Sequence, residues 1–153
     1  MASVAFGGQV ETSAGEAVYQ GRRMAARTPR TMLVVDDEPS LVRGLTRLLR
    51  HAGYAVAAAS NGCEALAQRH QRPYAVTLTD LRMPTLDGCA FYARLRQRWP
   101  ALCQRVIFLP GVSDDADSQA FLVQSGRPWL PKPYAMAALR SLIQQTLGTA
   151  AAE

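Results

Sequence analysis

Charged side chains follow several apolar runs in this chain, and these residues are the candidates for metal binding or catalysis. Asp36 and Asp37 follow the run TMLVV, and Asp80 follows the run AVTLT. Lys132 lies between two prolines in the segment LPKP. Carboxylates that meet repel one another, and a divalent cation relieves that repulsion. An all-oxygen ligand set suits Mg²⁺ better than zinc, and the lysine could pair with an anion.

The elements that must position these residues are predicted from the apolar pattern. Short apolar or β-branched runs predict strands at 31–35, 54–59, 74–79, 106–109 and 129–130. Helical spacing predicts helices at 39–53, 63–70, 89–99, 114–124 and 134–147. Such alternation implies parallel strands joined by right-handed crossovers, hence a three-layer α/β sandwich. Because the carboxyl ends of parallel strands share one edge, we expect the three aspartates and Lys132 to converge.

Three motifs in this order resemble the receiver domain of bacterial two-component response regulators. They are VVDDEP at 34–39, TDLRMP at 79–84 followed by Asp87-Gly88, and LPKP at 130–133. The resemblance covers residues 31 to about 147. It implies a flavodoxin-like α/β fold with a five-stranded parallel sheet in the order 2-1-3-4-5 and helices on both faces.

The resemblance also implies a role for each charged residue. Asp80 would accept a phosphoryl group from the phosphohistidine of a sensor histidine kinase or phosphotransfer protein. Asp37 and Asp80, with the backbone carbonyl of Arg82, would hold Mg²⁺, and Asp36 would contribute mainly through water. Lys132 would contact Asp80 or its phosphoryl group. Such a transfer needs charge neutralisation and in-line positioning rather than a strong base.

Two positions depart from the family pattern. Pro110 stands where the family has Thr or Ser, and proline has neither a hydroxyl nor a backbone N–H. Gly111 retains an N–H, and Ser113 could substitute if the loop bends. Trp129 replaces the usual Phe or Tyr at the second switch position. We therefore expect altered coupling between phosphorylation and output. The resemblance further implies a cis bond at Lys132–Pro133.

Composition bounds the domain organisation. The 153 residues support one core. Residues 1–30 are rich in small and polar types and predict a disordered leader, in which a basic tether is an alternative reading; Met24 or Met32 could be the true start. We expect a receiver domain at 31–148 and a short tail at 149–153. Without a second domain, output would require a downstream protein effector.

Other features of the composition exclude some classes. No run of about 18 apolar residues and no secretory signal is present, so we expect a cytoplasmic protein without membrane contact. Three cysteines without a CxxC pair predict neither a zinc site nor disulfides. The net charge of +5 comes mostly from scattered arginines, which predict a solvated surface rather than a nucleic-acid site.

Alternative readings stay open at this point. A pseudo-receiver that binds its partner irrespective of phosphate is favoured by Pro110. An aspartyl-phosphate phosphatase would need a second catalytic acid and a covering cap, for which the chain has little room, and no nucleotide-binding glycine motif occurs. Taken singly, Asp36, Asp37 and Glu38 could cap the following helix, and Lys132 could be a surface lysine. We expect a signalling domain rather than an enzyme.

Overall fold

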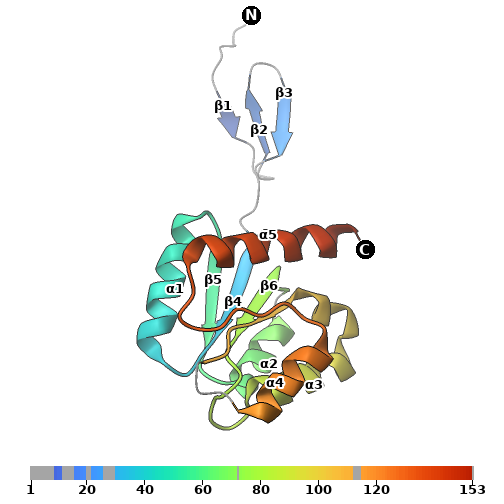
Figure 1. Cartoon of the computed structure of the whole chain (residues 1–153). Coiled ribbons are helices and arrows are strands. Elements are labelled where there is room, and N and C mark those ends of the chain that lie inside the picture. Colours follow the sequence, from blue (N-terminus) through green and yellow to red (C-terminus); the bar gives the residue numbers. More distant parts are fainter. Residues whose placement is uncertain are drawn as a thin grey trace, which may run out of the picture.

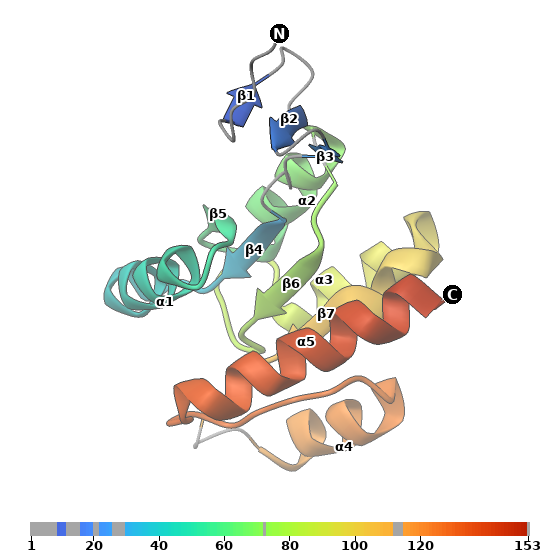
Figure 2. The same cartoon turned by 90° about the horizontal axis from the view of Figure 1, so that it is seen from above.

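The computed structural model describes residues 9–11, 16–19, 22–25, 30–71, 73–111 and 115–152. Four strands form a parallel sheet in the order β5-β4-β6-β7 (Figures 1 and 2). They are β4 (Thr31–Val35), β5 (Ala55–Ala59), β6 (Val76–Thr79) and β7 (Val106–Phe108). Their order is the one implied for the first four strands, and the predicted α/β fold with a parallel sheet is confirmed.

The fifth strand predicted at 129–130 is wrong as a strand. In the described residues it is reduced to one parallel bridge between Phe108 and Trp129. The Leu130 N–H donates to the Phe108 carbonyl at 2.9 Å. Pro128 lacks the N–H that would extend the ladder toward the start of β7, and Pro110 lacks the N–H that would donate to the Leu130 carbonyl. The chain therefore follows the sheet edge here without forming a longer strand.

Helices cover both faces of the sheet, giving the expected three layers. α1 (Pro39–His51) and α5 (Met136–Ala152) pack on one face. α2 (Gly62–Gln71), α3 (Gly88–Arg98) and α4 (Ala116–Ser125) pack on the other. A 3₁₀ helix, η2 (Pro100–Arg105), follows α3 and was not predicted.

Alternation along β4 explains why the sheet needs cover on both faces. Leu33 and Val35 are buried in the core shared with α2, α3 and α4, whereas Met32 and Val34 are buried in the core shared with α1 and α5. All four side chains are almost fully removed from water. A strand buried on both faces reads as a continuous apolar run, which is why TMLVV indicated a central strand.

The segment before residue 30 differs from the expectation that it contains no secondary structure. It contains β1 (Gln9–Glu11), β2 (Glu16–Tyr19) and β3 (Arg22–Ala25), paired antiparallel in that order. Strands of three or four residues are averaged out when composition is judged over a long window. The division into a leader, a domain at 31–148 and a tail stays a prediction. Among the described residues, no helix is long and apolar enough to span a membrane.

Candidate functional site

The carboxyl edge of the sheet brings the three predicted aspartates together. The Asp36 N–H donates to the Ala59 carbonyl at 3.1 Å, and the Asp80 N–H donates to the Val35 carbonyl at 3.0 Å. Each aspartate is thereby held just beyond the end of its strand. One carboxylate oxygen from each of Asp36, Asp37 and Asp80 lies within 4.8 Å of the other two. Asp36 is buried, Asp80 is half-buried and Asp37 is exposed.

Lys132 reaches this cluster from the segment that follows the β-bridge. Its Nζ donates to Asp36 Oδ2 at 2.8 Å and to Asp80 Oδ2 at 3.2 Å. Its backbone N–H donates to the Pro110 carbonyl at 2.8 Å, which anchors the segment beside the end of β7. The Lys132–Pro133 peptide bond is cis, as the resemblance implied. The contact with Asp36 was not foreseen from sequence.

The remaining carboxylate oxygens of the buried pair bind backbone N–H groups. Asp36 Oδ1 accepts from the Glu38 N–H at 2.9 Å, and Asp80 Oδ1 accepts from the Leu81 N–H at 2.7 Å. Glu38 occupies the N-cap position of α1, but its side chain makes no capping hydrogen bond. Glu38 therefore lies at the capping position without capping the helix through its side chain. Helix capping also does not explain why Asp36 pairs with Lys132.

Burial and neighbouring charges shift the pKa values of Asp80 and Lys132 at the centre of the site. Burial raises the pKa of the Asp80 carboxyl; Lys132 opposes this rise, and the charge of Asp36 adds to it. Burial acts to lower the pKa of the Lys132 ammonium. The hydrogen bond to Asp36 and the charges of both carboxylates outweigh burial, so that pKa is raised. Lys132 thus stays cationic at neutral pH beside carboxylates whose negative charge it only partly offsets.

The donor set fits Mg²⁺ on chemical grounds. The three carboxylates carry more negative charge than the one ammonium among them can neutralise. Hard oxygen ligands with room for water are the set that Mg²⁺ takes in proteins. Asp36, Asp37 and Asp80 would hold the ion, and when bound it would neutralise charge on the oxygens of an anionic ligand. The contribution of the Arg82 backbone carbonyl stays a prediction.

Gly62 and Gly88, the first residues of α2 and α3, support the loop after β6. The Gly88 N–H donates to the Leu81 carbonyl at 2.8 Å, and a Cβ on Gly88 would lie 2.2 Å from the Asp80 carbonyl oxygen. A Cβ on Gly62 would lie 2.6 Å from the Leu86 carbonyl oxygen. These helices can begin against the loop only because both residues lack a side chain. Their place at the first position of a helix was the available signal.

The departures from the family pattern lie at the edge of the site. Pro110 is buried just after the end of β7, and its carbonyl accepts a hydrogen bond from the Lys132 N–H. A Cβ added at Gly111 would meet no other atom within 4 Å. Ser113 lies outside the described residues. The Trp129 side chain is 38% exposed, so it stands partly outside the sheet edge. The effect of Pro110, Gly111 and Trp129 on switching stays a prediction.

An ion pair that the sequence did not reveal joins the loop after Asp80 to α4. Arg82 Nη2 lies 2.5 Å from Asp115 Oδ2, and both side chains are 55% exposed. Asp115 is the N-cap of α4, and its Oδ1 accepts from the Ser118 N–H at 2.9 Å. That N–H and the Arg82 guanidinium lower the pKa of the Asp115 carboxyl to about 2. A separation of 33 positions along the chain left no local signal for this pair.

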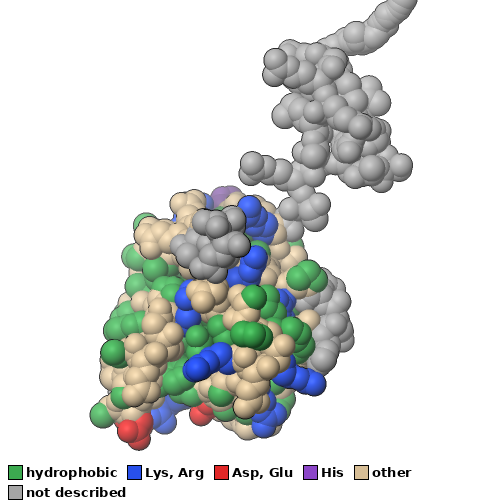
Figure 3. Space-filling view, turned by 90° about the vertical axis from the view of Figure 1, so that its right-hand side faces the viewer, with side chains coloured by type: hydrophobic (Ala, Val, Ile, Leu, Met, Phe, Trp, Pro, Cys, Tyr) green, Lys and Arg blue, Asp and Glu red, His purple; other side chains and the backbone are tan. Residues whose placement is uncertain are grey.

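Arginines dominate the flank of the molecule shown in Figure 3, where acidic side chains are few. Several arginines in the described part of the chain contact their own protein. Arg98 lies over the Trp99 ring at 5.5 Å, and Arg69 lies over the Tyr74 ring at 5.7 Å. Arg127 Nη1 donates to Gln104 Oε1 at 2.9 Å. These contacts are compatible with a solvated basic surface, and the expectation of no nucleic-acid partner stays a prediction.

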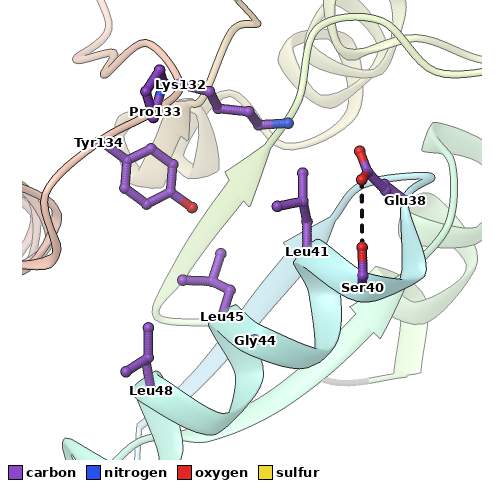
Figure 4. Close-up of a pocket in the computed structure, with 9 residues that line it drawn as sticks. All are labelled: Glu38, Ser40, Leu41, Gly44, Leu45, Leu48, Lys132, Pro133 and Tyr134. Carbon is purple, nitrogen blue, oxygen red and sulfur yellow. Dashed lines mark hydrogen bonds between the residues drawn. The ribbon is translucent and has the colours of Figure 1, made fainter.

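An apolar groove of about 540 Å³ adjoins the site (Figure 4). Leu41, Leu45 and Leu48 of α1 point toward Tyr134 across it, and Lys132 forms the end nearest the aspartates. Leu41 is 40% exposed and Leu48 is 47% exposed. Large apolar side chains that are left open beside a polar site are typical of an interaction surface.

Comparison with known proteins agrees with this geometry. The model of the response regulator receiver domain matches residues 32–144. The probable transcriptional regulatory protein TcrX of Mycobacterium tuberculosis is 34% identical over 129 residues, which are 81% of this chain and 54% of that protein. The DNA-binding transcriptional regulator NtrC of Salmonella typhimurium is 36% identical over 115 residues, 74% of this chain and 24% of that protein. The chain thus spans about half of these relatives or less.

Solved structures show the same fold. A crystal structure titled as a putative response regulator from Chloroflexus aurantiacus has a TM-score of 0.71 and 28% identity, covering 79% of this chain and 99% of that one. The receiver domain of the sensor histidine kinase PA1611 from Pseudomonas aeruginosa has a TM-score of 0.71 and 27% identity over the same shares, with magnesium coordinated in its active-site cleft. With its acidic edge, its lysine and its sheet order, the chain belongs to the response regulator receiver domain family, the phosphorelay signalling domains of two-component systems.

Proposed function

We propose that this receiver domain accepts a phosphoryl group on Asp80 from the phosphohistidine of a sensor histidine kinase or phosphotransfer protein. The observation that carries the proposal is the setting of the Asp80 carboxylate. It is half-buried at the sheet edge, with Lys132 Nζ 3.2 Å away and two further carboxylates within 4.8 Å. A carboxylate oxygen, a cation and two further acidic groups therefore lie in one small volume, which supports a role for Asp80 as phosphoryl acceptor.

The chemistry requires little of the protein beyond positioning and charge. A carboxylate oxygen of Asp80 attacks the phosphorus, the N–P bond of the phosphohistidine breaks, and its electron pair goes to the imidazole. An acyl phosphate forms on Asp80. Lys132 stabilises the added negative charge through its ammonium, while Asp36 keeps that ammonium in place. Asp36, Asp37 and the Arg82 backbone carbonyl would join Asp80 in holding Mg²⁺, and a bound ion would supply positive charge beside the phosphoryl group.

The apolar groove beside α1 is a suitable docking surface for the phosphodonor. Its end is formed by Lys132, so a helix lying along Leu41 and Leu48 would place a histidine side chain close to Asp80. An amphipathic helix buries its apolar face in such a groove. We propose that the histidine-bearing helix of the kinase or phosphotransfer protein is the occupant.

Output would follow through binding of a protein effector in the cytoplasm to the face formed by α4, the Trp129 bridge and α5. Pro110 cannot donate a hydrogen bond to the phosphoryl group, so the coupling of that face to Asp80 is altered. The rival function is a pseudo-receiver that binds its effector irrespective of phosphate, and Pro110 is the observation that favours it.

Intact-mass spectrometry tests the proposal. The protein is incubated with Mg²⁺ and acetyl phosphate, and one added phosphoryl group is expected. Asp80→Asn should abolish the adduct, whereas Asp117→Asn, which changes an exposed acid on α4, should retain it. Absence of the adduct on the unaltered chain would refute phosphoacceptance and support the pseudo-receiver. Continued phosphate release from several monoesters would instead indicate a phosphatase.

A further inference from the structure

The Arg82–Asp115 ion pair is the feature of the site region that the proposed function does not use. It links the loop that begins at Asp80 to the first residue of α4. Arg82 lies two residues beyond Asp80, so the guanidinium belongs to the same short loop as the phosphoryl acceptor. Asp115 holds the Ser118 N–H with its other oxygen, and its carboxylate therefore serves both Arg82 and α4.

This pair is set up to be broken by a stronger anion. Both side chains are 55% exposed, and exposed ion pairs contribute little to stability. Arg82 also brings a positive charge to the amino terminus of α4, where the helix dipole disfavours cations. A phosphoryl group on Asp80 would carry nearly two negative charges and three acceptor oxygens. Asp115 offers Arg82 only one oxygen beside the one that binds the Ser118 N–H, whereas a phosphoryl group offers more acceptor oxygens and more negative charge to the same guanidinium.

We propose that the Arg82 side chain is a phosphoryl-binding residue shared between Asp115 and the phosphoryl group on Asp80. When Asp80 is phosphorylated, Arg82 leaves Asp115 and contacts the phosphoryl oxygens, and the first turn of α4 is released from the loop after β6. The proposal rests on the proposed function of Asp80. It supplies a donor on the exposed side of the site, whereas Pro110 at the end of β7 has none to offer.

Because Arg82 exchanges one anion for the other in this proposal, the two contacts are thermodynamically linked. Loss of the Asp115 carboxylate removes one competitor for Arg82 and strengthens phosphoryl binding, and loss of Arg82 removes the influence of Asp115 on that binding. If the pair only stabilised the fold, replacing Asp115 would not tighten phosphoryl binding, and its effect on that binding would not depend on the presence of Arg82.

A double-mutant cycle measures the linkage. The dissociation constant of beryllofluoride, a phosphoryl analogue, is measured by calorimetry with Mg²⁺ on the full chain, Arg82→Ala, Asp115→Asn and the double variant. Asparagine caps helices as well as aspartate does, so Asp115→Asn removes the ion pair and keeps the cap. The Ser118 amide resonance in NMR spectra confirms that the cap is intact.

Asp115→Asn should tighten beryllofluoride binding about two- to fivefold, the range expected for an exposed ion pair. Arg82→Ala should weaken it about three- to tenfold. The double variant should match Arg82→Ala. Unchanged affinity in Arg82→Ala, or an equal gain from Asp115→Asn with and without Arg82, would overturn the proposal while leaving Asp80 as the acceptor. Absence of binding to the unaltered chain would overturn the acceptor role itself, and this proposal with it.

Discussion

Replacing Lys132 with methionine tests whether the ammonium offsets the repulsion within the aspartate cluster. The side chains of Asp36 and Asp80 are only 10% and 13% exposed, and each loses its hydrogen bond to Nζ in this variant. Two unit charges separated by 4.8 Å repel by about 3.5 kcal/mol at an effective dielectric constant of 20. Removing one partner of a buried ion pair costs about 3–5 kcal/mol. Because this site opens to water through Asp37, we expect the variant to lose about 2–3 kcal/mol of unfolding free energy at neutral pH.

Urea unfolding without divalent cations measures this loss, with Arg140→Met on the exposed surface of α5 as the matched control. Two conditions should reduce this loss of unfolding free energy. Added Mg²⁺ stabilises the folded state in proportion to its binding and replaces the missing positive charge. Lower pH neutralises Asp80, whose raised pKa means that its charged form disfavours folding, so the variant should recover as pH falls below that pKa. An unchanged urea midpoint at neutral pH without Mg²⁺ would show that Lys132 does not offset the repulsion.

Three further predictions concern the same site. Gly88→Ala should lower the unfolding free energy by about 1–3 kcal/mol because the new Cβ would collide with the Asp80 carbonyl. Gly44→Ala is the control, since a Cβ there would meet no atom within 4 Å and should not lower the unfolding free energy. Urea unfolding of both variants measures the difference. Asp80→Asn should raise the thermal midpoint at neutral pH, since burial disfavours the carboxylate, and the gain should vanish as pH falls through the unfolded-state pKa near 3.8; a gain that persists in acid contradicts this cause. Pro110→Thr should tighten beryllofluoride binding about tenfold by restoring a hydroxyl donor, and calorimetry showing no change would place the hydroxyl out of reach.

Local pattern was sufficient for much of the fold. TMLVV, followed by acids and then Pro39, contains its own strand, loop and helix start, and the structure begins β4 and α1 at Thr31 and Pro39 as predicted. Apolar periodicity is a property of neighbouring residues, so it survives without knowledge of the rest of the chain. The adjacency of each acid to a strand end likewise predicted the cluster at the carboxyl edge, because parallel strands share that edge.

The fifth strand shows where local pattern was insufficient. Trp129 and Leu130 are apolar and suit a strand, but Pro128 and Pro110 lack N–H groups that the ladder needs, and pairing is limited to one bridge. The prolines were visible in the sequence. Their effect depends on which edge of the strand faces β7, because a missing N–H removes a ladder hydrogen bond only where it would point at a carbonyl of the neighbouring strand. That orientation is a tertiary property.

The α/β class, the order in which acids follow strands, and the identity of the charged residues that could meet all follow from the amino-acid sequence. The distances between these residues depend on how the folded chain packs. This packing pairs Lys132 with Asp36 as well as Asp80, presses Gly88 against the Asp80 carbonyl, and joins Arg82 to Asp115 at the start of α4. Contacts between residues far apart in the chain are set by helix packing and loop paths, and these depend on the whole core rather than on any segment.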